Sequence, residues 1–437
     1  MARLVPLQED FPFDIISHDV PVTPFREYPT AVVDESRGLR LSVKQYIPRD
    51  DKHRTNEALR TEPITIIAAG ALGIAKESYE PLFEELLRCA QSSGVLIRSI
   101  WMADMFNVGQ SALLNQDNLG CDPAWIDHSR DLWSLISRFS DLMVKPIVGL
   151  GHSFGCNQLL CLSCWHPSLF HSFAFVEPGI DARYGRGITI PWALQALRQR
   201  DSFPTRAEAE DAVVKLNNAA SWDPRALSRL KHYSVRQARD KDGARSVWRP
   251  VTPKHQIAAL VSRFNPGRVG LGPNGTKGVT MAEREVVPDS DPLAFNIGPF
   301  YRHELRLAWN MLPSMRPCVL YVNGAKSPFF GHPATREERL RRTGTGVGGN
   351  GGVKLGAVRQ VVIEGGEHTM VFDESLKTVA AHVADWLADE CRRWTEGPKR
   401  RRELWLRDAK DKGSVGSDFL AALDAEMKRM KSRAGKL

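Results

Sequence analysis

Residues 146–167 form the stretch "PIVGLGHSFGCNQLLCLSCWHP". It begins with a short apolar run typical of a buried strand, and an apolar run with helical spacing follows. The pattern Gly-His-Ser-Phe-Gly, with Ser153 at its centre, joins the two. A G-x-S-x-G between a strand and a helix is typical of a nucleophile elbow, which exposes a serine hydroxyl above a sheet. The stretch therefore predicts a nucleophilic Ser153, and a chance Gly-Ser-Gly turn is the alternative.

Runs typical of strands alternate with amphipathic runs on both sides of this stretch. Strands are expected at 39–49, 62–70, 95–104, 145–150, 170–178, 316–325 and 358–368, and helices at 76–91, 123–141, 154–165 and 374–394. This alternation predicts a mostly parallel sheet flanked by helices.

The alternation of strands and helices stops between Gly179 and about Arg316. Short helical segments and links rich in proline and glycine replace it there. Together with the elbow, this organisation predicts an α/β-hydrolase fold with an inserted, mainly helical cap. We expect the first part of the core at 1–178, the cap at 179–316, the second part of the core at 317–396 and a basic extension at 397–437.

Length, composition and charge argue against a membrane-spanning, secreted or nucleic-acid-binding protein. The 437 residues are 42% hydrophobic and 25% charged, and no run of 18 apolar residues predicts a membrane span. The N-terminus has no apolar signal segment, and the seven cysteines are an odd, scattered set, which favours a reducing compartment. The 41 residues from 397 onward hold 12 of the 59 basic and 6 of the 51 acidic residues, so most of the net charge of +8 lies there. No nucleic-acid motif accompanies it, and no nucleic-acid partner is expected.

A serine nucleophile needs a histidine base held by a carboxylate, and in this fold the chain order is serine, acid, histidine. His368 follows the last predicted strand and precedes the closing helix, so it is the expected base. The predicted strand that comes before it, at 316–325, is followed by no acidic residue in "NGAKSPFFGHP". Glu177, at the end of the strand "AFVEP", is therefore the expected acid. Asp181, Asp291 and Asp373 are the alternatives.

Two backbone amides are expected to form the oxyanion hole. The first is the N–H of Phe154, which begins the helix after the elbow. The second comes from the loop Gly70-Ala71-Leu72-Gly73, where Leu72, or else Ala71, is the candidate. His152, inside the elbow, is interpreted as a structural residue that points away from the serine hydroxyl.

No cofactor or metal is expected. No HxxEH motif or His/Asp cluster suggests a metal, and the GxGxxG at 344–352 precedes a strand instead of opening a helix. Cys161 and Cys164 form a CxxC without a second pair, which is better interpreted as two small core residues on a helix.

The last three residues, Gly435, Lys436 and Leu437, are similar to the tripeptide that directs proteins to peroxisomes, with glycine in place of the usual serine or alanine. They predict a peroxisomal import receptor as a partner. A basic tail that happens to end in leucine, in a cytoplasmic protein, is the alternative.

Several longer stretches are not general hydrolase motifs: "PVTPFREYP", "LSVKQYIP", "AKESYEPLFEELL", "RSIWMAD", "IDHSRDL", "VGLGHSFG", "DPLAFNIGPFYR" and the terminal "GKL". In these the sequence resembles the fungal peroxisomal acyl-CoA hydrolases of secondary metabolism, including mycophenolic acid biosynthesis, over most of the chain. The resemblance implies a capped, homodimeric α/β hydrolase that cleaves a CoA thioester in the peroxisome. It assigns the family's serine to Ser153, its histidine to His368 and its acid, an aspartate, to Glu177. The family's oxyanion loop, His-Gly-x-Gly, differs here in its first two positions.

The favoured function is thus hydrolysis of an acyl-CoA thioester through an acyl-enzyme on Ser153. A carboxylesterase, lactonase or lipase would use the same three residues on an oxygen ester. Two further hypotheses are acyl transfer to a small alcohol or amine, and a catalytically inactive hydrolase that binds a ligand or partner.

Overall fold

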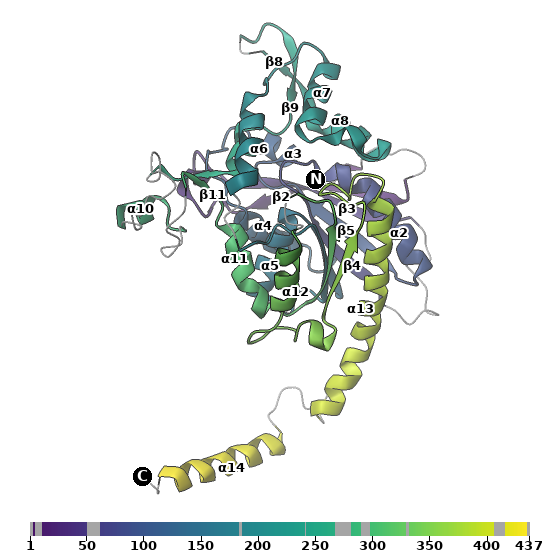
Figure 1. Ribbon diagram of the computed structural model, residues 1–437, viewed down its shortest axis with the longest axis vertical. Coiled ribbons are helices and arrows are strands. Elements are labelled where there is room, and N and C mark those ends of the chain that lie inside the picture. The colour runs from purple at the N-terminus through teal and green to yellow at the C-terminus, as the bar shows by residue number, and fades with distance from the viewer. Residues whose placement is uncertain are drawn as a thin grey trace. The chain divides into compact units, whose positions relative to one another are not determined.

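The computed structural model describes residues 3–4, 11–49, 62–182, 186–240, 242–266, 281–289, 298–328, 332–405 and 416–434. The chain forms two compact units, residues 1–390 and 391–437. The larger unit is built around one sheet (Figure 1).

The strands of this sheet follow the order β1-β2-β3-β5-β4-β6-β7-β12-β13 in the described part of the chain. In that order they span Arg3–Leu4, Phe13–Val22, Leu39–Pro48, Ile97–Ala103, Ile64–Ala69, Ile147–His152, Ser172–Val176, Cys318–Gly324 and Val358–Ile363. The strands from β5 to β13 pair in parallel, and β1, β2 and β3 form an antiparallel edge. The predicted, mostly parallel sheet is confirmed. Strand β2 was not predicted, because Ser17, His18 and Asp19 interrupt its apolar alternation.

Helices cover both faces of the sheet (Figure 1). On one side lie α2 (Glu80–Ser92) and residues 376–390 of α13 (Leu376–Trp405). On the other lie α4 (Ile126–Arg138), α5 (Phe154–Trp165), α11 (Glu304–Met311) and α12 (Pro333–Arg342). Residues 154–163 of α5 are all buried, as expected for a helix that is apolar around its whole circumference.

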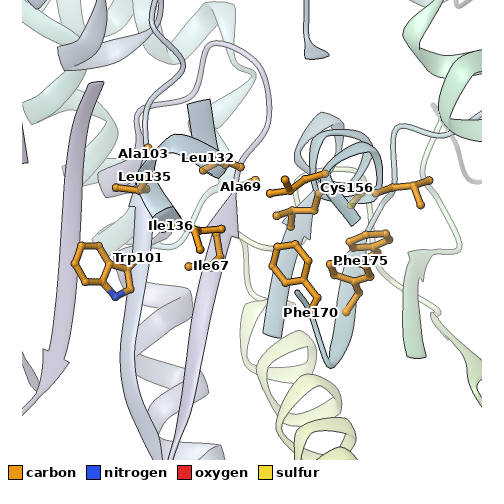
Figure 2. Close-up of a cluster of buried hydrophobic side chains, with 14 of the residues drawn as sticks. Ile67, Ala69, Trp101, Ala103, Leu132, Leu135, Ile136, Cys156, Phe170 and Phe175 are labelled. Carbon is orange, nitrogen blue, oxygen red and sulfur yellow. The ribbon is translucent and has the colours of Figure 1, made fainter. Parts of the chain in front are cut away.

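The main core lies between the sheet and α4 and α5, and Figure 2 shows its centre. Alternate residues of the strands point into it, as Ile67 and Ala69 do from β4. Leu132, Leu135 and Ile136 meet them from α4 at the spacing of one helical face. Each fully buried side chain of this size contributes roughly 1.5–3 kcal/mol to folding. This packing holds the carboxyl ends of the parallel strands in fixed positions.

Between β7 and β12 the chain forms a succession of smaller elements. These are α6 (Arg186–Arg198), α7 (Arg206–Leu216), α8 (Pro224–Ser234), β8 (Val235–Arg239), β9 (Ser246–Pro250), α9 (Lys254–Val261), β10 (Arg263–Phe264), α10 (Met281–Val286) and β11 (Phe300–Tyr301), followed by α11. The expected helical pieces are present, but the antiparallel pairs β8–β9 and β10–β11 were not predicted. Figure 1 shows α7, α8, β8 and β9 grouped together at the top of the view.

The remaining elements are short, apart from the last helix. They are α3 (Gly109–Leu114) and 3-10 turns at Pro29–Ala31, Lys76–Tyr79, Ala219–Ser221, Leu312–Ser314 and Val353–Leu355. In the C-terminal unit, α14 spans Ser417–Ala434. Among the described helices, none combines the length and apolar character needed to cross a membrane.

Candidate active site

Ser153 stands at the sharp turn between β6 and α5, as the sequence predicted. Its backbone lies in an unusual region, with φ 56° and ψ −117°, which a residue other than glycine adopts only under local strain. A Cβ on Gly155 would lie 2.0 Å from the Ala69 carbonyl oxygen, and one on Gly151 would lie 2.8 Å from the Cys156 Cα. Both motif glycines are therefore required by the close approach of backbone to backbone.

The structure brings Ser153, His368 and Glu177 together from three separate loops. The Ser153 Oγ lies 2.9 Å from the His368 Nε2, and the His368 Nδ1 lies 3.2 Å from the Glu177 Oε2. Glu177 follows β7, and His368 lies between β13 and α13. A carboxylate only accepts hydrogen bonds, so the Nδ1 carries a proton and the Nε2 lone pair faces the serine hydroxyl. This is the arrangement of a nucleophile, a base and an orienting acid.

Glu177 is completely buried, and its carboxylate is held by two further donors. The Gly324 N–H donates to the Glu177 Oε1 at 2.7 Å, and the Ser327 hydroxyl donates to the Oε2. Burial alone would raise the pKa of Glu177, but the hydrogen bonds from His368, Ser327 and Gly324 outweigh burial and lower it. The carboxylate is thus kept ionised beside His368.

Gly324 and Ser327 were missed by the sequence analysis. They lie at the end of β12, in the loop "NGAKS" that was noted only for lacking an acidic residue. Because β12 lies beside β7 in the sheet, the end of β12 brings these two donors to the Glu177 carboxylate.

His152 makes no bond to the serine and instead holds the backbone of the histidine loop. Its Nε2 lies 2.9 Å from the His368 carbonyl oxygen, and its Nδ1 lies 2.8 Å from the Tyr79 hydroxyl. The Tyr79 hydroxyl in turn accepts the Ala71 N–H at 2.7 Å. Burial, together with the neighbouring His368, lowers the pKa of His152 to about 3, so its ring is neutral. A chain of hydrogen bonds therefore joins the loop after β4 to the backbone of His368.

This line of hydrogen bonds favours Leu72 over Ala71 as the oxyanion candidate in the loop 70–73. The Ala71 N–H is already donated to Tyr79, whereas the Leu72 N–H has no acceptor among the described residues. Leu72 is buried and packs in one apolar cluster with Phe154, whose amide begins α5. The far end of the loop is fixed by Lys76, whose ammonium lies 2.7 Å from the Asp104 carboxylate.

Two of the three alternative acids, Asp181 and Asp373, belong to the described residues. The Asp373 carboxylate accepts the Ser375 N–H at 2.8 Å, just before α13 begins. Asp181 is buried, and its N–H bonds the Leu305 carbonyl at 3.4 Å. Asp291 lies outside the described residues.

The cysteine pair and the possible metal ligands provide no second site in the described ranges. Cys161 is buried in an apolar cluster with Tyr28 and Ile126, and burial raises the pKa of the Cys164 thiol to about 11. Burial raises the pKa of the Cys161 thiol as well, so both thiols are protonated at neutral pH. No three His, Cys, Asp or Glu side chains of the described residues are grouped to hold a metal ion.

Comparison with known proteins identifies the family. No protein-family model matches the chain. The chain is 35% identical to the type I acyl-CoA thioesterase mpaH of Penicillium brevicompactum, over 97% of this chain and 98% of that protein. The mpaH thioesterase of Penicillium roqueforti is 33% identical over 90% of this chain and 93% of its own length. The chain belongs to the mpaH family.

Known structures agree on the fold of this mpaH-family chain. The peroxisomal α/β-hydrolase Lpx1 of Saccharomyces cerevisiae superimposes with a TM-score of 0.62, covering 97% of this chain and 98% of Lpx1, at 16% identity. These comparisons confirm the α/β-hydrolase fold and the family resemblance found in the sequence, and the chain is a hydrolase.

Proposed function

We propose that this mpaH-family hydrolase cleaves the thioester of an acyl-CoA, with Ser153 as the nucleophile, His368 as the base and Glu177 as the orienting acid. The observation that carries the proposal is the continuous line of hydrogen bonds, 2.9 Å from Ser153 to His368 and 3.2 Å from His368 to Glu177. The substrate class is supported by a second observation. The chain is similar, over nearly its whole length, to proteins named acyl-CoA thioesterases.

In the first half of the reaction, the Ser153 Oγ attacks the thioester carbonyl carbon while its proton passes to the His368 Nε2. The tetrahedral intermediate collapses, the carbon–sulfur bond breaks, and CoA leaves as its thiol with the proton from His368. In the second half, a water molecule gives a proton to the same nitrogen and attacks the acyl-enzyme. The carboxylic acid is released and Ser153 regains its proton.

The negative charge of each tetrahedral intermediate would lie between the Phe154 and Leu72 N–H groups. Two backbone donors suit this role because they are already oriented and need no reorganisation during the reaction. Removing a single donor of this kind typically costs 10²–10³ in kcat, so the position of the 70–73 loop contributes strongly to the proposed catalysis.

The substrate class is tested by incubating the protein with aromatic and medium-chain acyl-CoAs and with the matching oxygen esters, while free thiol is trapped. The Ser153→Ala variant is the control. Thiol release that depends on Ser153, with little turnover of the oxygen esters, is expected. Turnover of the oxygen esters without thiol release would overturn the thioester assignment and favour a carboxylesterase, lactonase or lipase.

We also propose a peroxisomal location and a homodimeric state, as the family resemblance implies, with residues 179–316 acting as the cap. The terminal Gly435, Lys436 and Leu437, which would bind the import receptor, lie outside the described residues. Deleting these three residues is expected to leave a fluorescent fusion of the protein in the cytosol. Analytical ultracentrifugation of the full chain is expected to give the mass of a dimer.

A further inference from the structure

Two arginines on the β8–β9 hairpin face each other across the strands. Arg236 of β8 and Arg249 of β9 are direct partners in the antiparallel register, so their side chains leave the same face of the hairpin. Like charges placed opposite each other in this way repel and destabilise a hairpin. Burial and the nearby charge of Arg249 lower the pKa of Arg236. The fold therefore maintains an unfavourable pair of positive charges.

Neither arginine is neutralised within the described part of the chain. No described carboxylate forms an ion pair with either guanidinium, whereas Arg206 of α7 and Arg225 of α8 both do. The Nε atoms of Arg236 and Arg249 are buried and have no hydrogen-bond partner among the described residues. Buried donors without acceptors are uncommon in folded proteins and call for a ligand or water to satisfy them.

Both arginines line one cavity of about 200 Å³, which also reaches the loop that follows β4. Gly73, next to Leu72, forms part of its wall, together with Ile257 of α9. Lys254 lines it as well, but its ammonium is paired with Asp201 at 2.7 Å. The volume is smaller than that of a pocket for a whole drug-sized ligand, so it suits one charged group of a longer molecule.

We propose that Arg236 and Arg249 bind the phosphate groups of the CoA moiety, an inference that rests on the proposed thioesterase function. A guanidinium donates two parallel hydrogen bonds to a phosphate, and two such groups on one face match a dianion. CoA carries its phosphates at the end remote from the thioester. The cavity that begins beside Leu72 would give that end of the substrate a separate anchor.

The direct test is calorimetric binding of CoA lacking its sulfur and of adenosine 3′,5′-diphosphate, neither of which can be hydrolysed. The full-length protein is compared with Arg236→Gln, Arg249→Gln and the double variant. We expect each single substitution to weaken binding about tenfold, because a hydrogen bond to a charged group is lost. Arg239→Gln is the matched control, since Arg239 is an exposed arginine of the same strand, is not a cavity-lining residue and points to the opposite face.

A kinetic test uses an acyl-CoA and the same acyl group on pantetheine, which has no phosphate. The preference of the unmodified protein for the acyl-CoA, measured as a ratio of kcat/KM values, should fall at least tenfold in the double variant through a higher KM. Unchanged CoA affinity and an unchanged ratio would overturn the phosphate site while leaving the thioesterase function intact. Binding that is lost in the variants, in a protein that cleaves no thioester, would support the phosphate site and refute the proposed function.

Competition by inorganic pyrophosphate tests whether the two arginines recognise phosphate groups themselves. Competition of millimolar pyrophosphate against CoA in the unmodified protein, but not in the double variant, would support the arginines as a phosphate site. Equal competition in both proteins would contradict it.

Discussion

At the scale of single residues, His368 is held at three points. Glu177 bonds its Nδ1, Ser153 faces its Nε2, and His152 bonds its backbone carbonyl oxygen. Burial raises the pKa of Tyr79, so its hydroxyl stays protonated and can donate to His152 while it accepts from Ala71. Tyr79 thereby connects the position of the histidine to that of the proposed oxyanion loop.

Replacing Tyr79 by phenylalanine removes both of these hydrogen bonds and leaves the His152 Nδ1 without a donor. We expect kcat to fall about tenfold with little change in KM, and stability to fall by about 1–3 kcal/mol. Steady-state kinetics and urea denaturation measure the two effects. Tyr321→Phe is the matched control, since this buried hydroxyl bonds Thr343 at 2.9 Å, away from His368. An equal loss of activity in both variants would show that Tyr79 acts only through general stability.

The sequence indicated the serine, the histidine and the acid because each follows a strand that its apolar pattern makes visible. It did not indicate Ser327 or Tyr79, because their importance depends on contacts between distant parts of the chain. Ser327 and Glu177 are 150 residues apart, and Tyr79 and His152 are 73 apart. No local pattern reports such a contact.

At the scale of elements, the turn between β6 and α5 has no room for a side chain at Gly155. An alanine Cβ would lie 2.0 Å from the Ala69 carbonyl oxygen, a backbone atom within the sheet that cannot move aside. Gly155→Ala should therefore destabilise the protein by about 3 kcal/mol. Gly365→Ala, where no atom lies within 4 Å, should change stability by less than about 0.5 kcal/mol. Urea denaturation midpoints compare the two, and similar midpoints would contradict the packing of the elbow.

The start of α11 carries a buried ionic network. The His303 Nδ1 lies 2.6 Å from Asp289 and 3.3 Å from Glu304. Burial alone would lower the pKa of His303, but these two carboxylates outweigh burial and raise it to about 10. Burial likewise opposes ionisation of Glu304, yet Arg302 and His303 lower its pKa to about 2.

The signs of these shifts define a pH window. A histidine with a raised pKa stabilises the fold fully below about pH 6.5, and this contribution is lost as the pH rises towards 10. A carboxyl group with a lowered pKa stabilises it above about pH 4.5, and this contribution is lost as the pH falls towards 2. The network should therefore contribute most near pH 5–6.

The variant His303→Asn tests this window. Its Tm should lie at least about 3 °C below that of the unmodified protein at pH 5.5, and the difference should shrink steadily up to pH 10. His332→Asn, an exposed histidine before α12, should show no such dependence. A difference that stays constant or grows with rising pH would contradict the assignment of a charged His303.

At the scale of the whole molecule, the sequence predicted the α/β-hydrolase fold well because buried parallel strands give long apolar runs. It predicted the segment between β7 and β12 less well. Residues of β8 such as Gln237 and Arg239 are exposed, so this hairpin lacks a continuous apolar signal. The arginine pair of that hairpin could not be predicted either. Two residues that face each other on neighbouring strands can be identified only when the register of the strands is known.

The proposed function depends on Ser153 being a nucleophile activated by His368 and Glu177. The most direct measurement is labelling with a fluorophosphonate, followed by peptide mass spectrometry of the modified protein. We expect one adduct on Ser153, absent in Ser153→Ala and formed at least a hundredfold more slowly in Glu177→Gln, which leaves His368 without its charged partner. An adduct on another residue, or labelling of Ser153 at an unchanged rate in Glu177→Gln, would contradict it.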